Sequence, residues 1–248
     1  EWVDGADMDR ERFLTAMEAY KGKSSSACPS PETWARAFSE GDHVIAITIT
    51  GGLSGSYNSA LLGRDLLWEK QPHKPVYVLD SRSAGAEIAL LVFRACELIA
   101  RGLPFEQVTQ QLWLYHQHTH LLFLLEHVDN FVKNGRLNKL VAATIGMLGV
   151  RILGCASEHG TLQPLMKPRG AARGLDLLVR ELERAGYAGG QLAITHVQNE
   201  EGAARLASLI REVWPGAPCL LLPASGLCSY YGEKHGLIVG FEDGQARI

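Results

Sequence analysis

Short apolar segments alternate with helical ones along the first half of the chain, and this alternation constrains the fold most. Residues 43–49 and 75–80 have the length and composition of buried β-strands, and residues 54–70 and 83–100 have that of helices. Further helices are expected at residues 9–20, from residue 31 onwards and at 105–115. The order strand, helix, strand, helix is typical of a parallel sheet with helices on both faces. We therefore predict an α/β fold.

The second half of the chain has a different pattern. Residues 150–156 and 161–167 read as two strands joined by "SEHG", as in a β-hairpin. Further strands are expected at residues 120–125, 191–197, 219–222 and 237–241, and helices at 128–133, 137–148, 174–185 and 200–213. A hairpin among helices indicates a second, mixed α/β layer. We therefore predict two domains, comprising residues 1–118 and 119–248.

Charge and composition exclude several classes of protein. The net charge is -3 at pH 7 and the basic residues do not cluster, so a nucleic-acid partner has no electrostatic support. No apolar run reaches the ~20 residues that cross a bilayer, and the acidic, polar first residues do not resemble a signal peptide. The five cysteines are odd in number and form no Cys-x-x-Cys pair. Such cysteine usage favours a reducing environment, so we expect a cytoplasmic location.

The segment "ITITGGLSGSYNSA", residues 47–60, carries the clearest candidate site. Gly51 and Gly52 allow close approach to the backbone, the amides at a helix start lack partners, and Thr50, Ser54 and Ser56 add hydroxyl groups. The end of a parallel strand is also where open α/β sheets bind ligands. The segment therefore predicts a small anion site for a carboxylate or a phosphate. The alternative is an ordinary helix start with Ser54 as its N-cap.

Sharper catalytic and cofactor motifs do not fit this segment. Its spacing is not Gly-x-Gly-x-x-Gly, and no Gly-Lys-Ser/Thr is present, so no nucleotide cofactor is predicted. The nucleophile motif Gly-x-Ser-x-Gly nearly fits residues 52–56, but its last position is Ser56. A serine-dependent hydrolase or a phosphate-handling enzyme using Thr50 to Ser56 thus stays as an alternative function.

Three histidines at alternate positions, His116, His118 and His120, invite a metal-site hypothesis. On one strand they would share a face, with a spacing that suits zinc or nickel. No acidic residue near them in the sequence completes a ligand set. We therefore predict no metal site.

Five segments together resemble the bacterial DegV family, whose members bind fatty acids. In order along the chain they are "SACPSP" from Ser26, "ITITGGLSGSYNSA", "PVYVLDSRSAG", "NGRL" from Asn134, and "GVRILGCASEHGTLQPLMKPR". The resemblance spans almost the whole chain.

The resemblance implies a two-domain DegV-like α/β fold with one long-chain fatty acid between the domains. By position, Ser26 and Thr50 would contact the carboxylate, with Gly51, Gly52 and Ser54 in support. Arg136 would either tie a loop to the sheet or contact the head group. The resemblance also implies a carrier that performs no chemistry and presents the acid to a fatty acid kinase.

The chain departs from the family pattern in three places. It begins at "EWVDG", which resembles a later family segment, so the usual opening strand has no counterpart in this sequence. Ala27 and Cys28 replace a polar pair in the loop. The family's C-terminal histidine motif is replaced by residues 228–236, where Tyr230 is the nearest counterpart of that histidine.

Overall fold

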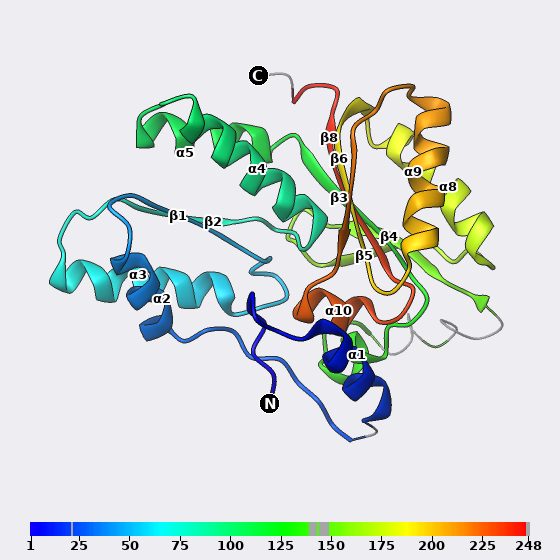
Figure 1. Cartoon of the computed structure of the whole chain (residues 1–248), viewed down its shortest axis with the longest axis horizontal. Helices are drawn as coiled ribbons and strands as arrows, with labels where there is room; N and C mark the ends of the chain where they lie inside the picture. Colours follow the sequence, from blue (N-terminus) through cyan, green and yellow to red (C-terminus); the bar gives the residue numbers. More distant parts are fainter. Residues whose placement is uncertain (21, 139–142, 144–148, 247–248) are drawn as a thin grey trace.

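The computed structural model describes residues 1–20, 22–138, 143 and 149–246 (Figure 1). Its helices are α1 (Arg10–Ala19), α2 (Pro31–Ser39), α3 (Ser56–Lys70), α4 (Ala86–Ala100), α5 (Phe105–His116), α6 (Asp129–Lys133), α8 (Ala171–Arg184), α9 (Glu200–Val213) and α10 (Gly226–Gly232). Its strands are β1 (Val44–Thr48), β2 (Val76–Asp80), β3 (Thr119–Leu125), β4 (Ile152–Ala156), β5 (Leu162–Met166), β6 (Tyr187–His196), β7 (Cys219–Pro223) and β8 (Leu237–Asp243). The predicted α/β class is confirmed.

A small parallel sheet is formed by β1 and β2. The pairing runs from Val44 opposite Val76 to Thr48 opposite Asp80. Helices α2 and α3 cover one face, where Phe38 and Ala60 are buried against strand residues. Because parallel strands end at the same edge, the loops that follow Thr48 and Asp80 lie side by side.

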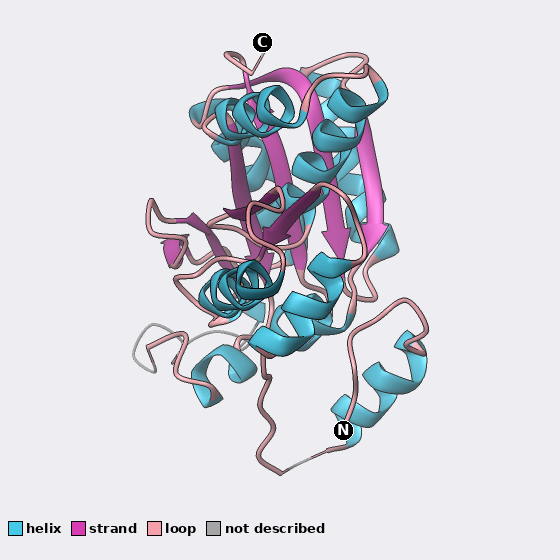
Figure 2. Cartoon of the chain, turned by 90° about the vertical axis from the view of Figure 1, so that its left-hand side faces the viewer, coloured by secondary structure: helices cyan, strands magenta, loops and turns pink. Residues whose placement is uncertain are grey.

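A larger mixed sheet has the strand order β5-β4-β3-β8-β6-β7. Strands β6 and β7 are parallel, and the other neighbouring pairs are antiparallel, including the predicted hairpin β4–β5. Figure 2 shows these strands side by side with helices on either side of them. Helices α8 and α9 pack on one face through a buried cluster that includes Leu178, Leu206 and Phe241.

Helix α4 packs against both sheets. Its residues Leu90 and Leu91 belong to one buried cluster with Leu79 of β2, Phe123 of β3 and Tyr231 of α10. We call this set of buried residues the seam cluster. It connects the small sheet, α4, the large sheet and α10 in one continuous apolar core.

Several element boundaries differ from the predictions. Helix α3 begins at Ser56 rather than residue 54, and α4 begins at Ala86 rather than residue 83. Helix α10 was not predicted, because "GLCSYYG" is short and has glycine at both ends. The expected helix at residues 137–148 lies mostly outside the described residues.

Helix α4 is not buried on every side. Val92 and Phe93 are 42% and 52% exposed, whereas Leu91 is fully buried. The helix therefore has one face in the seam cluster and another at the surface. None of the helices within the described ranges is long and apolar enough to cross a bilayer.

Replacing Leu91 by alanine is expected to lower the free energy of unfolding by about 2–5 kcal/mol, because it opens a cavity in the core that joins the two sheets. Urea titration followed by circular dichroism measures the change. Phe93→Ala, on the exposed face of the same helix, is the matched control and should cost less than half as much. Equal losses for the two variants would show that α4 does not join the sheets in this way.

Candidate functional site

The turn that follows β1 is held from the opposite sheet. Thr50 is buried, and its Oγ1 donates a hydrogen bond to the carbonyl oxygen of Gly160 at 2.8 Å, while accepting one from the amide of Gly52 at 3.0 Å. Gly160 has φ = +69°, and a Cβ atom there would collide with Thr50 Oγ1. The loop between β4 and β5 therefore requires glycine where it meets the turn.

The amide of Gly51 does not face an open anion site. The Asp80 carboxylate accepts hydrogen bonds from the amides of Gly51 at 3.0 Å and Arg82 at 2.9 Å. The parallel pairing of Thr48 with Asp80 places this carboxylate beside the turn. Asp80 thus occupies part of the positive end that the sequence predicted for a ligand.

Ser54 is not the helix cap. The N-cap of α3 is Gly55, and Ser54 Oγ accepts a hydrogen bond from the amide of Ser56 at 3.2 Å. Its hydroxyl also shares a hydrogen bond with Ser56 Oγ at 3.0 Å. Within the described part of the chain these partners include no histidine and no carboxylate. The geometry therefore does not assemble a serine hydrolase triad around Ser54.

Two adjacent tyrosines of α10 meet the segment that precedes α2. Tyr231 Oη lies 2.8 Å from Ser26 Oγ, and Tyr230 Oη lies 2.7 Å from Ser24 Oγ. The side-chain Nδ2 of Asn134 donates a further hydrogen bond to Tyr230 Oη at 3.0 Å. The structure thus places Tyr231, which the sequence reasoning missed, against the candidate Ser26. It directs the predicted Tyr230 toward Ser24 and Asn134.

The local start of α10 explains why these tyrosines sit there. The carboxylate of Asp4 accepts hydrogen bonds from the amides of Gly226 at 2.9 Å and Leu227 at 2.8 Å. A residue more than 200 positions away therefore satisfies the first amides of this helix. No signal near residue 230 could have indicated this contact.

Arg136 joins the tyrosines to the turn. Its Nε donates a hydrogen bond to the carbonyl oxygen of Leu53 at 2.8 Å, and its guanidinium lies 5.1 Å from the ring centroid of Tyr231. Leu53 in turn donates its amide to the carbonyl oxygen of Thr50 at 3.4 Å. Ser26, Tyr231, Arg136 and the turn at Thr50 are therefore connected, next to the seam cluster.

The three histidines do not share one strand face. His116 ends α5, and its Nε2 lies 2.8 Å from the carbonyl oxygen of Ser81. His118 Nδ1 and His120 Nε2 lie 3.4 Å and 3.0 Å from Asp243 Oδ2. Asp243 of β8 is an acidic neighbour that is distant in the sequence, so proximity along the chain was a poor guide. Among the described residues, no group of three or more histidines, cysteines or acids is placed to hold a metal ion.

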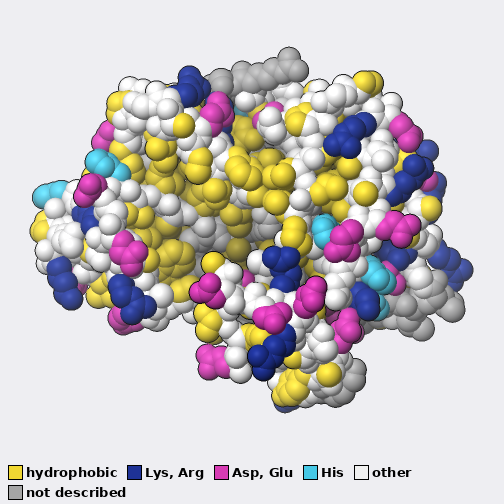
Figure 3. Space-filling view, in the orientation of Figure 1, with side chains coloured by type: hydrophobic (Ala, Val, Ile, Leu, Met, Phe, Trp, Pro, Cys, Tyr) yellow, Lys and Arg dark blue, Asp and Glu magenta, His cyan; other side chains and the backbone are white. Residues whose placement is uncertain are grey.

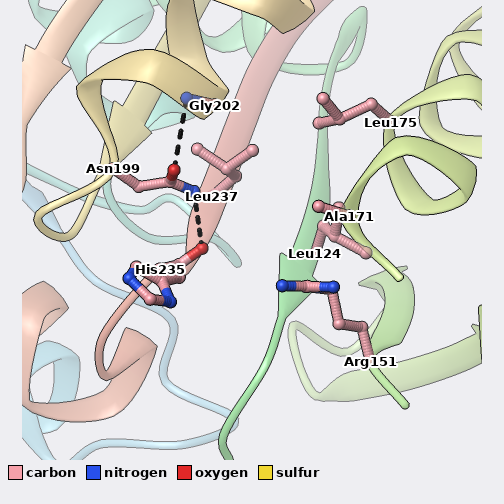
Figure 4. A pocket seen from close by; sticks show the side chains of 8 residues that line it. All are labelled: Leu124, Arg151, Ala171, Leu175, Asn199, Gly202, His235 and Leu237. Carbon is pink, nitrogen blue, oxygen red and sulfur yellow. Dashed lines mark hydrogen bonds between the residues drawn. The ribbon is translucent and has the colours of Figure 1, made fainter. Parts of the chain in front are cut away.

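A small pocket of ≈ 170 Å³ lies between α8, α9 and the ends of β3 and β8 (Figure 4). Arg151 and His235 flank it, and both contact the carboxylate of Glu126. Although burial works in the opposite direction, these two groups hold the pKa of Glu126 below its ordinary value. Neither Thr50 nor Ser26 lines this pocket, so it is separate from the turn.

One face of the molecule carries a broad apolar area. Figure 3 shows hydrophobic side chains gathered over a broad, hollowed area in the middle of the molecule, between the small sheet and the large one. Val92 and Phe93 of α4 are among the exposed hydrophobic residues. An apolar surface of this kind suits the hydrocarbon part of an amphipathic ligand.

Comparison with known proteins reveals close relatives. Residues 1–237 match the model of a family described as "Uncharacterised protein, DegV family". A DegV domain-containing protein of Streptococcus pneumoniae is 44% identical over 241 residues, which are 97% of this chain and 86% of that protein. One from Streptococcus gordonii is 42% identical over 243 residues, covering 98% of this chain and 86% of that protein.

Solved structures agree in fold. The fatty acid kinase B3 protein of Streptococcus pneumoniae, loaded with linoleic acid, has a TM-score of 0.95 at 44% identity and covers 97% of this chain and 86% of its own. A DegV family protein from Eubacterium eligens, loaded with heptadecanoic acid, has a TM-score of 0.93 at 37% identity and covers 98% and 88%. With a family match across residues 1–237 and relatives this similar in sequence and structure, the chain belongs to the DegV family.

Proposed function

We propose that this protein binds one long-chain fatty acid and carries it as a non-catalytic, cytoplasmic protein. One observation carries the proposal: two relatives, at 44% and 37% identity over nearly the whole chain, hold linoleic acid and heptadecanoic acid. The absence of a histidine or carboxylate from the described partners of Ser54 also favours a carrier over a hydrolase.

The head group would lie where Ser26, Thr50 and Arg136 approach one another. Hydroxyl donors and one guanidinium can hold a carboxylate there, with Tyr231 Oη positioning Ser26 at 2.8 Å. Gly52 allows the close approach of the loop at His159, whose carbonyl oxygen a Cβ atom would contact. Gly51 and Ser54 would support the turn, whereas Tyr230 would hold the flanking segment through Ser24.

The acyl chain would lie along the seam cluster and the hollowed apolar surface (Figure 3). Each CH₂ group removed from water contributes roughly 0.8 kcal/mol. A long chain therefore gains most of its affinity from the apolar surface, and the hydroxyl groups mainly orient the carboxylate. We further propose residues 1–118 and 119–248 as the two domains on either side. In support of this, β1 and β2 precede residue 118 and the six strands of the large sheet follow it.

The proposed partner is the catalytic subunit of a fatty acid kinase. One relative is named as a fatty acid kinase B3 protein, which suggests that this chain also presents its acid for phosphorylation. The chain would contribute binding and orientation, and the kinase would contribute the chemistry.

Protein purified from bacteria without delipidation is expected to carry a fatty acid, because the apolar seam recruits one from the cell. Native mass spectrometry should show an excess mass in the fatty-acid range that disappears on denaturation. A ligand-free mass, together with ester or phosphate-ester hydrolysis that Ser54→Ala abolishes, would instead favour the enzyme hypotheses.

Thr50→Ala is expected to weaken fatty-acid binding by about 1–3 kcal/mol, the usual cost of removing a hydrogen-bond partner from a charged group. Displacement of a fluorescent fatty acid measures the affinity, and thermal melting checks that the fold is intact. Thr50→Ser retains the hydroxyl and is the matched control, with near-normal affinity expected. Unchanged affinity in a folded Thr50→Ala variant would place the head group elsewhere.

The loaded protein, mixed with ATP, Mg²⁺ and a bacterial fatty acid kinase catalytic subunit, is expected to yield acyl phosphate and ADP. The acyl phosphate can be trapped with hydroxylamine and measured as the hydroxamate. Delipidated protein is the control and should release no ADP beyond background. Failure of the loaded protein to give hydroxamate with an active kinase would argue against this partner.

A further inference from the structure

A second cavity, of ≈ 330 Å³, is lined in part by Ser81 and Arg82 of the loop that follows β2. It occupies a notch in the large sheet. Strand β3 begins at Thr119, but its pairing with β4 begins only at Leu122 opposite Cys155. The first residues of β3 therefore have β8 on one side and this cavity on the other.

Glu87 of α4 is the most unusual side chain in the cavity wall. It is only 3% exposed, and its Oε1 accepts a hydrogen bond from Thr119 Oγ1 at 2.8 Å. Within the described ranges, no lysine or arginine forms an ion pair with it. Burial raises the pKa of this carboxyl above its ordinary value. A buried acid without a cation is costly when ionised, so an occupant that supplies the cation would relieve that cost.

The charges around the cavity leave Glu87 without a counter-ion. The groups that face it or line the same space are Tyr115, His116, His120, Arg82, Glu158, Glu181 and Arg184. Arg184 pairs with Glu181 at 2.7 Å, His120 contacts Asp243, and His116 contacts the Ser81 carbonyl. Arg82 and Glu158 are exposed. The opposite charges of the paired groups largely cancel. Glu87 therefore remains a buried acid without a paired cation.

Two helix ends add to the negative character of this space. Gln117, which caps the C-terminus of α5, and Ala185, which caps that of α8, both line the cavity. Helix C-termini carry partial negative charge and favour nearby cations. A buried carboxyl and two helix C-termini in the wall of one cavity therefore both favour a cation there.

We propose that this cavity binds a small organic cation with a primary ammonium group, and that the Glu87 carboxylate is its counter-ion. The ammonium would sit between Glu87 and the ends of α5 and α8, with its carbon chain against Leu121 and Leu122 of the cavity wall. This site goes beyond the proposed fatty-acid site and does not depend on it.

The cavity is also connected to the turn. The Ser81 carbonyl contacts His116 from the cavity side, and the Ser83 carbonyl accepts a hydrogen bond from the Thr50 amide at 2.8 Å. Residues 81–83 thus separate the two sites by a single short loop. A ligand in the cavity would therefore contact the loop whose backbone accepts the hydrogen bond of the Thr50 amide.

The test uses three probes of equal length on the full chain as purified: n-butylammonium, 1-butanol and butyrate. Isothermal titration calorimetry is expected to show saturable binding of n-butylammonium alone. Glu87→Gln, which preserves shape but cannot ionise, should weaken that binding by at least about tenfold, as expected for loss of a charged partner. Glu158→Gln, an exposed acid on the same cavity, is the matched control and should change it less than about twofold.

The wild-type protein supplies an independent measurement. Burial raises the pKa of Glu87, and an ammonium ion beside the carboxyl would lower that pKa. At a pH near the pKa, binding should therefore release protons, and the heat of binding should depend on the ionisation enthalpy of the buffer. Binding should also strengthen as the pH rises toward the pKa of Glu87. The proposal is overturned if n-butylammonium does not bind saturably, or if 1-butanol binds equally well. Either result leaves the fatty-acid proposal untouched.

Discussion

Helix α4 is shared by two sheets, and the rest of the structure depends on this packing. Leu90 and Leu91 of α4 lie in one apolar core with residues of both sheets and of α10. A two-stranded sheet is only marginally stable alone, so β1 and β2 need the layers on their faces. Contact with α4 therefore stabilises the small sheet and sets its position against the large one. Without the packing of α4 against both sheets, the turn after β1 and the loop of the β4–β5 hairpin would not be held in contact.

The candidate site follows from that arrangement. Thr50 follows β1, Gly160 belongs to the hairpin of the large sheet, and a hydrogen bond of 2.8 Å joins them. Arg136 reaches the same turn through Leu53, and Tyr231 lies beneath its guanidinium. Each residue comes from a different element, so the site exists only when both sheets are assembled around α4.

Sequence reasoning succeeded where the determining interactions are local. The start of α2 at residue 31 and the hairpin around "SEHG" could be predicted because all partners lie within a few residues, as in the contact of Ser30 Oγ with the Thr33 amide. The parallel pairing of β1 with β2 followed from the alternation of strands and helices. The contact between Tyr231 and Ser26 spans 205 positions and depends on α10, a helix without apolar periodicity. No local pattern encodes such a contact.

The contacts of the protein's own carboxylates explain why a bound fatty acid would rely on side-chain hydroxyl groups rather than on backbone amides. Asp80 already accepts the amides of Gly51 and Arg82, and Asp4 accepts the first amides of α10. The backbone donors that usually hold an anion at such turns are therefore committed to the protein's own side chains. In the proposed site, an incoming carboxylate would therefore rely on side-chain donors, namely the hydroxyls of Thr50 and Ser26 and the guanidinium of Arg136. A hydroxyl group can redirect its hydrogen atom by rotation, whereas the amides are fixed in the backbone of the turn. A site made of side-chain donors over a fixed backbone can thus release its ligand without disturbing the fold, as a carrier requires.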